Sequence, residues 1–448
     1  MSYGFVVFPD PMEIAGAQAP GTDENVQLVA GSLAAPSANR ESTVGALPAG
    51  LELILARLKE SGASELEDAL AQAIDPGEDM PALITTASAS AAKASEVTLF
   101  GFAGAALFPS LSVDQRRRLR GTGLRVVANR RVFRTPPSSF IEAAGPVDPA
   151  AATAEAWHLE AIGARSLHQR GFQGQGQMIG IMDTGIDASH PEFAGKLVEY
   201  AEFDPLGRII SNVARDLDVH GTHVAALAAG RTMGAAPQAS LAVAAVLTYR
   251  TSKGMSGTVA QILGGLQWLV AREPENGDTI TVINASLGGP PNNDYLYSTV
   301  RSAREDGIAF VASIGNEGEN GENSHRSPGD YDVTVGVGAH DRNRRIASFS
   351  SWGSPVQHQG LSKPDLSAPG VQVVSAIPGG RFASMPGTSM ASPLVAGALA
   401  LIRQGLGEQD VDALVQVLYE RHLEPAQPPS AHRAGRGCLV LDPTFGPN

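Results

Sequence analysis

The feature that most constrains this fold is an alternation of short apolar strands and helices in the last two thirds of the chain. Apolar runs of strand length occur at 178–182, 241–247, 279–284, 308–313 and 333–337. Segments that suit helices separate or follow them at 221–229, 259–270, 294–305 and 389–404. Strands that alternate with helices favour a parallel sheet covered on both faces. We therefore predict an α/β fold with a mostly parallel central sheet.

The first 135 residues have a different pattern, which predicts a small α+β domain. Strands are expected at 3–8, 97–102 and 124–133, with helices over 51–74, broken at Gly62, and from Ser112. Segments 10–48 and 86–95 are rich in small residues and predict loops. We divide the chain into an N-terminal domain at 1–135, a linker at 136–155 and a larger domain at 156–448.

The composition limits the classes of partner that the chain is expected to bind. The chain has a net charge of −13 and only 5% aromatic residues, which disfavours binding to nucleic acid or to anionic lipid. No apolar stretch reaches the roughly 18 residues of a membrane span. The first residues have no basic segment and no long apolar run of a signal peptide. We expect a cytoplasmic protein without a membrane partner, and export by another route stays open.

Three segments hold residues that could perform chemistry. Asp183 ends an apolar strand and a glycine turn follows it, so we expect its carboxylate at the sheet edge where sites form. His223 precedes a run of tiny side chains that predicts a closely packed helix. Ser389 lies where a loop enters a helix, whose unpaired N–H groups favour negative charge. Pro393 is expected to be tolerated because it lies in the first turn of that helix.

Each segment alone has another explanation. The Asp183 motif also fits an aspartic protease, but that enzyme needs a second such carboxylate and the sequence has no second D-[ST]-G. His220 and His223 could belong to a zinc site, although the chain lacks an HExxH pattern. Ser389 could be a helix N-cap. The order Asp, His, Ser along one chain favours a catalytic triad over all three.

With these motifs in this order, the chain resembles the subtilisin-like serine proteases, the subtilases of peptidase family S8, over about residues 150–405. The resemblance implies a three-layer subtilisin-like fold and a serine endopeptidase with Asp183, His223 and Ser389 as its triad. In that chemistry the histidine takes the proton of the serine as the serine attacks a peptide carbonyl. The aspartate fixes the imidazole tautomer.

The resemblance also implies residues that bind the substrate. Asn316, in the sequence Gly-Asn-Glu-Gly, would donate a hydrogen bond to the oxyanion together with the Ser389 backbone N–H. Glu317 would lie at the edge of the specificity pocket, where its charge could favour basic substrate side chains. The strand expected to bind the substrate backbone comprises Ser286, Leu287, Gly288 and Gly289.

A metal is not expected from these motifs. Extracellular subtilisins often carry a calcium loop after the histidine segment, and the stretch from His223 to Pro237 shows none. Glu192 stands where the family often has a calcium carboxylate, and without the loop we expect it to be a surface residue. We predict no cofactor and no metal ligand, with calcium left open.

The N-terminal part resembles a subtilase propeptide of the inhibitor I9 type, carried by the segments 97–107 and 124–133. This implies a zymogen whose own propeptide is a partner, beside a protein or peptide substrate, and a cut within 135–155. A permanently attached accessory domain is the alternative. A rival function is a non-catalytic protein-binding module on a subtilase scaffold. A module of that kind would lack a triad or oxyanion residue of the family, and this sequence has all of them.

Overall fold

The computed structural model describes residues 5–8, 49–60, 65–66, 69–70, 97–100, 103, 105–108, 111–134, 155–252, 254–271, 279–356, 361–407 and 410–445. It divides into two compact units, Met1–Arg130 and Arg131–Asn448. The predicted loops at 10–48 and 86–95 lie outside the described residues, and so does the predicted linker at 136–155 apart from its last residue.

The N-terminal unit is built on an antiparallel sheet with two described helices. Its strands, in spatial order, are β2 (Thr98–Phe100), β3 (Ala105–Phe108), β1 (Phe5–Phe8) and β4 (Arg125–Ala128). Its helices are α2 (Ala49–Glu60) and α4 (Val113–Gly121). Ser112 caps α4 by accepting from the Gln115 N–H, in a reciprocal capping box. Apolar side chains of both helices and of β1, β3 and β4 share one buried core.

The second unit is centred on a 10-stranded sheet. Its strands, in spatial order, are β19 (Leu423–Glu424), β20 (Cys438–Leu439), β16 (Leu366–Pro369), β15 (Val335–His340), β14 (Ala309–Ser313), β12 (Thr279–Ala285), β6 (Gln177–Asp183), β9 (Ser240–Ala245), β7 (Val198–Phe203) and β8 (Ile209–Ser211). All neighbours pair in parallel except the two edge pairs, β7 with β8 and β19 with β20. The carboxyl ends of the central strands therefore meet at one edge.

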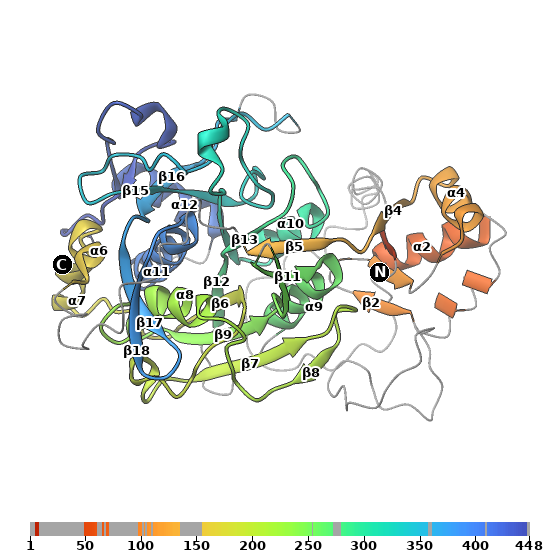
Figure 1. Cartoon of the computed structure of the whole chain (residues 1–448), viewed down its shortest axis with the longest axis horizontal. Helices are drawn as coiled ribbons and strands as arrows, with labels where there is room; N and C mark the ends of the chain where they lie inside the picture. The colour runs from red at the N-terminus through yellow and green to blue at the C-terminus, as the bar shows by residue number, and fades with distance from the viewer. Residues whose placement is uncertain are drawn as a thin grey trace, which may run out of the picture. The chain divides into compact units, whose positions relative to one another are not determined.

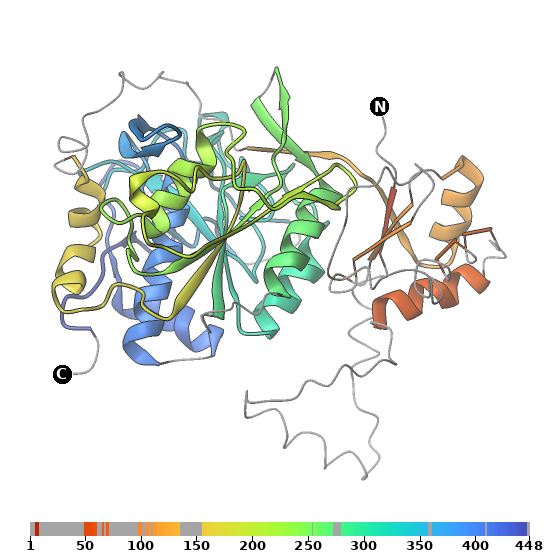
Figure 2. The same cartoon turned by 90° about the horizontal axis from the view of Figure 1, so that it is seen from below.

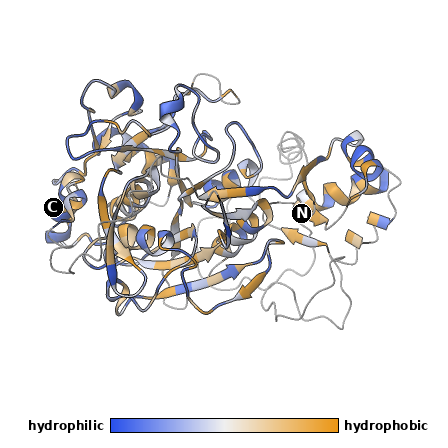
Figure 3. Ribbon diagram, viewed as in Figure 1, coloured by the Kyte–Doolittle hydropathy of each residue, from blue (hydrophilic) through white to orange (hydrophobic). Residues whose placement is uncertain are grey.

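Helices cover both faces of this sheet. Helices α8 (His220–Ala229) and α11 (Thr388–Leu406) pack on one face, and α9 (Val259–Val270) and α10 (Tyr297–Glu305) on the other, as Figures 1 and 2 show. Helices α6 (Trp157–Ala161), α7 (Ala164–Gln169) and α12 (Val411–Arg421) lie outside them. The central strands and α11 are mainly hydrophobic, whereas the surrounding loops are mainly hydrophilic (Figure 3). The sequence prediction of a three-layer α/β fold is confirmed.

A smaller sheet lies beside this core and includes a segment next to the N-terminal unit in sequence. Its strands, in spatial order, are β10 (Tyr249–Thr251), β11 (Gly254–Thr258), β5 (Arg131–Arg134) and β13 (Leu287–Gly288). Strand β5 pairs antiparallel with both β11 and β13 and so lies between them (Figure 1). The predicted single strand over 124–133 is therefore wrong, because the chain leaves β4 at residue 128 and β5 joins a different sheet. A hairpin of β17 (Val373–Ile377) and β18 (Arg381–Met385) completes the unit.

Among the described residues, no helix is both long and apolar enough to span a membrane.

Candidate active site

Asp183 and His220 form a buried pair at the carboxyl edge of the sheet. Asp183 is the last residue of β6 and is fully buried. His220 is the first residue of α8, and its Nδ1 lies 2.7 Å from Asp183 Oδ1. The same oxygen accepts a 2.7 Å hydrogen bond from the Thr184 N–H. A carboxylate in this position can hold one imidazole tautomer, with the proton on Nδ1.

His223, which the sequence analysis placed in the triad, does not contact this carboxylate. Its Nε2 lies 3.1 Å from the carbonyl oxygen of Ala383 in β18, and its Nδ1 has no hydrogen-bond partner among the described residues. Both histidines project from the same side of α8, one turn apart. Only the first of them reaches the strand end. The prediction that His223 pairs with Asp183 is therefore wrong, and His220 takes that position.

Burial keeps His223 neutral, together with a second internal histidine. Desolvation lowers the pKa of His223 from 6.5 to about 3 and that of His158 from 6.5 to about 4. An unfolded histidine titrates near 6.5, so between that pH and the lowered pKa the unfolded chain binds protons that the folded chain does not. The free energy of unfolding should therefore fall as the pH drops below about 6.5, by up to about 1.4 kcal/mol per pH unit for each histidine.

We expect thermal unfolding midpoints to fall steadily between pH 6.5 and pH 4. The variant His223→Gln keeps an N–H donor for Ala383 but removes one titrating group, so its midpoint should depend less on pH than that of the wild type. Melting curves followed by circular dichroism at a series of pH values test this. A variant with the full wild-type pH dependence would show that His223 does not contribute.

The half-buried carboxylate of Asp216 fixes the start of α8. Asp216 Oδ2 accepts from the Thr222 N–H at 2.7 Å and from its hydroxyl at 2.6 Å. Asp216 Oδ1 accepts from the Thr184 hydroxyl at 2.7 Å, and that hydroxyl accepts from the Gly221 N–H. A Cβ on Gly221 would lie 2.1 Å from the carbonyl oxygen of Gly185, so only glycine allows this approach. The network holds His220 against the end of β6.

Ser389 lies in the first turn of α11. Its side chain is buried, and among the described residues its Oγ has no hydrogen-bond partner. The Pro393 ring has no N–H to donate to the Ser389 carbonyl oxygen four residues earlier. The Ser286 hydroxyl replaces that bond at 3.0 Å and also lies 3.0 Å from the Ser392 hydroxyl. Pro393 is thus accommodated by the Ser286 side chain, which lies between β12 and β13. The expected reason, a position in the first turn where no acceptor needs its N–H, does not apply, because α11 begins five residues earlier at Thr388.

Asn316 lies next to the start of the same helix. Its Oδ1 accepts from the Thr388 N–H and hydroxyl, both at 2.9 Å. A Cβ on Gly387, whose φ is +152°, would lie 3.4 Å from Asn316 Nδ2 and 3.7 Å from the Ser389 nitrogen. Two N–H donors therefore border one space beside Gly387, and the lack of a side chain there keeps that space open.

The predicted substrate strand forms β13 and the residues around it. Leu287 and Gly288 pair with Arg134 and Phe133 of β5, so this edge binds an extended chain. The Ser286 side chain is buried, and its hydroxyl serves α11, so it does not face a substrate. The Gly289 N–H donates to the Ser327 carbonyl oxygen at 2.8 Å.

Glu317 is half-buried and already paired. Its Oε1 accepts from Arg326 Nη2 at 2.9 Å, and its Oε2 accepts from the Asn316 N–H at 3.0 Å. The charge that the sequence analysis assigned to binding basic side chains is thus neutralised by Arg326. Sequence reasoning missed that arginine, because it belongs to no motif with a catalytic signature.

Glu192 does not behave as a surface residue. It is 3% exposed and accepts hydrogen bonds from the Thr232 N–H at 2.8 Å, the Thr232 hydroxyl at 2.5 Å and the Met233 N–H at 3.1 Å. Its carboxylate therefore closes the short loop after α8 by direct hydrogen bonds. No cluster of three or more metal-binding side chains occurs within the part of the chain that the structure describes.

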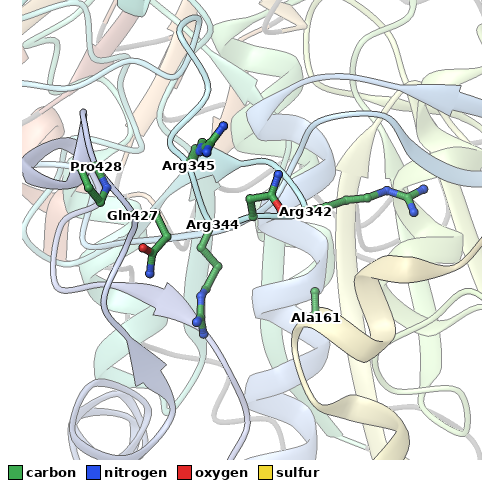
Figure 4. A pocket seen from close by; sticks show the side chains of 7 residues that line it. Ala161, Arg342, Arg344, Arg345, Gln427 and Pro428 are labelled. Atoms are coloured by element: carbon green, nitrogen blue, oxygen red, sulfur yellow. The ribbon is translucent and has the colours of Figure 1, made fainter.

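A separate hollow of about 560 Å³ lies between α6 and the loop after β15. Its lining comprises Ala161, Arg342, Asn343, Arg344, Arg345, Gln427 and Pro428 (Figure 4). Arg344 is paired with Glu424, and Arg342 lies over the Trp157 ring. None of Asp183, His220 and Ser389 lines it.

Comparison with known proteins places the larger unit in one family. Residues 174–433 match the model of the subtilase family, Peptidase_S8. Subtilisin E of Bacillus subtilis (strain 168) is 38% identical over 250 residues, which cover 54% of this chain and 60% of subtilisin E. The subtilisin of Bacillus pumilus is 37% identical over 250 residues, covering 54% of this chain and 82% of that protein. An intracellular serine protease of Paenibacillus polymyxa is 33% identical over 239 residues, covering 52% of this chain and 68% of that protein.

The matched part includes Asp183, His220, Asn316 and Ser389. The likeness to subtilisin E extends over less than two thirds of that protein's length. By its sequence, its three-layer fold and the arrangement of this site, the chain belongs to the subtilase family.

Proposed function

We propose that the protein is a serine endopeptidase whose triad is Asp183, His220 and Ser389. The observation that carries this is the buried 2.7 Å contact between Asp183 Oδ1 and His220 Nδ1. Helix α8, which carries His220, packs against α11, which carries Ser389. His223 has no part in the triad because a backbone carbonyl occupies its Nε2. The substrate is a protein or peptide.

The chemistry follows from these groups. His220 Nε2 removes the proton of Ser389 Oγ as that oxygen attacks a peptide carbonyl carbon. The C–N bond then breaks, the proton passes from His220 to the leaving amine, and an acyl-enzyme forms. Water, activated by the same imidazole, attacks the ester and releases the acid. Asp183 stays ionised and stabilises the imidazolium.

Asn316 and the Ser389 backbone N–H are the proposed donors to the oxyanion. Support comes from their shared position beside Gly387, since a substrate oxygen in that space would reach both nitrogens. The Asn316 amide is oriented by Thr388, whose N–H and hydroxyl both donate to its Oδ1, and its Nδ2 lies on the side of Gly387. Such fixed donors stabilise charge that develops only in the transition state.

A fluorophosphonate probe tests the proposed nucleophile. We expect the wild-type protein to be labelled covalently on Ser389, because only a serine activated by an adjacent base attacks the phosphorus rapidly. The variant Ser389→Ala should not be labelled. The matched control is Ser392→Ala, which removes a buried hydroxyl one turn further along α11 and should keep its label. A wild type that reacts no faster than Ser389→Ala would favour a non-catalytic binding module.

We further propose that residues 1–135 form a propeptide, that 136–155 link it to the peptidase domain at 156–448, and that the chain is made as a self-inhibited zymogen. The position of β5 supports this. Its four residues lie as an extended strand between β11 and β13, where a substrate chain would lie. Val132 is 6% exposed in that position, and Arg131 donates to the Ser256 hydroxyl at 3.3 Å.

The variant Val132→Asp should weaken this docking. Burial of a valine side chain is worth about 1.5–3 kcal/mol, and a charge in its place adds a desolvation cost. We expect the intact chain to cleave a peptide substrate at least about tenfold faster than the intact wild type. Initial rates with gel analysis of the chain test this. Val113→Asp makes the same change on the exposed face of α4 and should have no effect. Equal rates for all three proteins would exclude β5 as the inhibitory segment.

A further inference from the structure

We propose that Arg326 is a specificity-determining residue, and that it makes this enzyme prefer substrates with a carboxylate side chain at P1, the residue on the acyl side of the cut bond. This inference rests on the proposed peptidase function and deepens it. It replaces the expectation that Glu317 would attract basic side chains.

The register of β5 locates the P1 position. Arg134 lies opposite Leu287, so the next residue of a chain bound in this way lies opposite Ser286. The Ser286 hydroxyl donates to the carbonyl oxygen of Ser389. A residue opposite Ser286 is therefore the one whose carbonyl group comes nearest to the start of α11. Its side chain enters between the segment at Gly288 and the segment at Gly315, which follow the neighbouring parallel strands β12 and β14.

The side chain of Arg326 lies between these two segments. A Cβ on Gly288 would be 2.9 Å from Arg326 Cβ, and a Cβ on Gly315 would be 2.8 Å from Arg326 Cγ. Both positions therefore need glycine so that the arginine stem can pass. The stem reduces the space available to a large aromatic P1 side chain.

Backbone hydrogen bonds hold Arg326 in this place from both sides. Its own N–H donates to the Ile314 carbonyl oxygen at 2.8 Å, next to Gly315. The carbonyl oxygen of the following residue, Ser327, accepts from the Gly289 N–H at 2.8 Å. The arginine is thus fastened to the two segments that border the P1 side chain, and it is positioned before a substrate arrives.

The charges here favour an acidic partner. Glu317 Oε1 is paired with Arg326 Nη2, and Glu317 Oε2 accepts from the Asn316 N–H and lies 3.4 Å from the Ser351 hydroxyl. A basic P1 side chain could not pair with the Glu317 carboxylate, which is already bound to Arg326, and the nearby guanidinium would repel it. A guanidinium has five N–H donors, and the described contacts of Arg326 use one. Its side chain is 30% exposed, so the other donors can reach a P1 carboxylate.

The test is a set of peptides that differ only at P1, carrying Glu, Lys, Phe or Ala, with kcat/KM measured for the full-length protein. We expect kcat/KM for the peptide with Glu at P1 to exceed that for the peptide with Lys by at least about tenfold. The peptide with Phe at P1 should be a poor substrate. The variant Arg326→Gln should lower the ratio of kcat/KM for the Glu peptide to that for the Lys peptide at least about tenfold. The variant Arg326→Lys should still prefer the Glu peptide. The variant Glu317→Gln should raise kcat/KM for Glu, because it releases the guanidinium.

Arg342→Gln is the matched control, since it removes the same charge from the separate hollow in Figure 4 and should leave the ratio unchanged. A wild type that prefers Lys or Phe, or an Arg326→Gln variant with the wild-type ratio, overturns the inference while peptide cleavage continues. If neither the wild type nor the Val132→Asp variant cuts a peptide or is labelled by the fluorophosphonate on Ser389, the proposed function itself fails and the inference fails with it.

Discussion

Replacing His220 by glutamine is expected to lower kcat for peptide hydrolysis by about 10⁶, the scale known for loss of the histidine of subtilisin. The expected loss is this large because no other imidazole is in contact with Asp183 Oδ1 among the described residues. Glutamine cannot accept the serine proton at neutral pH, so only the oxyanion donors and substrate binding would still act. Initial rates with a sensitive peptide substrate measure the effect.

The matched variant is His223→Gln, which makes the same substitution one turn further along α8. We expect its kcat to stay within about tenfold of the wild type, because glutamine can donate to the Ala383 carbonyl oxygen as the imidazole does. A buried hydrogen bond of poorer geometry should cost about 1–3 kcal/mol of stability. If His223→Gln abolished hydrolysis and His220→Gln did not, the assignment from the structure would be reversed.

The two histidines also show what the sequence could not decide. Residues at i and i+3 lie on the same side of a helix, so the spacing of His220 and His223 places both toward the sheet. The two histidines differ in how far they lie from the first residue of the helix. The hydrogen bonds of Asp216 determine where α8 begins, and their partners come together only in the tertiary structure. The positions of Asp183 and Ser389 in the fold were easier to predict, because the first ends a strand and the second lies in the first turn of a helix.

The fold was predictable wherever local patterns agreed with tertiary packing. Helix α9 has the predicted bounds, Val259–Val270, because Thr258 caps it in a capping box and its apolar side chains face the sheet. The segment 124–133 was not predictable in the same way. Its apolar residues suit one strand, but β4 and β5 pair with partners in different sheets. Those partners are far away in sequence, so the break at residues 129–130 has no local signal.

Arg326 was missed for a related reason. A single arginine in a loop of polar residues carries no motif, and its importance arises from two glycines in other segments. Those glycines were identified as part of family motifs, but what fills the space beside them could be seen only in three dimensions. The burial of Glu192 could not be predicted for the same reason, because it depends on hydrogen bonds to the short loop after α8.

Replacing Asp183 by asparagine is expected to lower kcat by about 10⁴ at neutral pH, the scale known for the same change in another serine protease triad. In the wild type, Asp183 Oδ1 accepts from both the Thr184 N–H and His220 Nδ1. An asparagine can place only a neutral oxygen or an amide N–H at this shared position. The neutral oxygen stabilises the imidazolium less than a carboxylate does, and the N–H would hold the tautomer with its proton on Nε2, which cannot act as a base for Ser389.

The loss should therefore come from the missing charge or the wrong tautomer and not from a damaged fold. Asp183 Oδ2 is buried and has no hydrogen-bond partner among the described residues, a costly arrangement for a carboxylate whose only task is structural. The thermal midpoint of Asp183→Asn should accordingly match or exceed that of the wild type while kcat collapses. Asp187→Asn, four residues further along the same segment, is the matched control and should keep most of the activity. An Asp183→Asn variant that retains kcat within about tenfold would mean that this carboxylate does not orient the base, and that His220 acts without it.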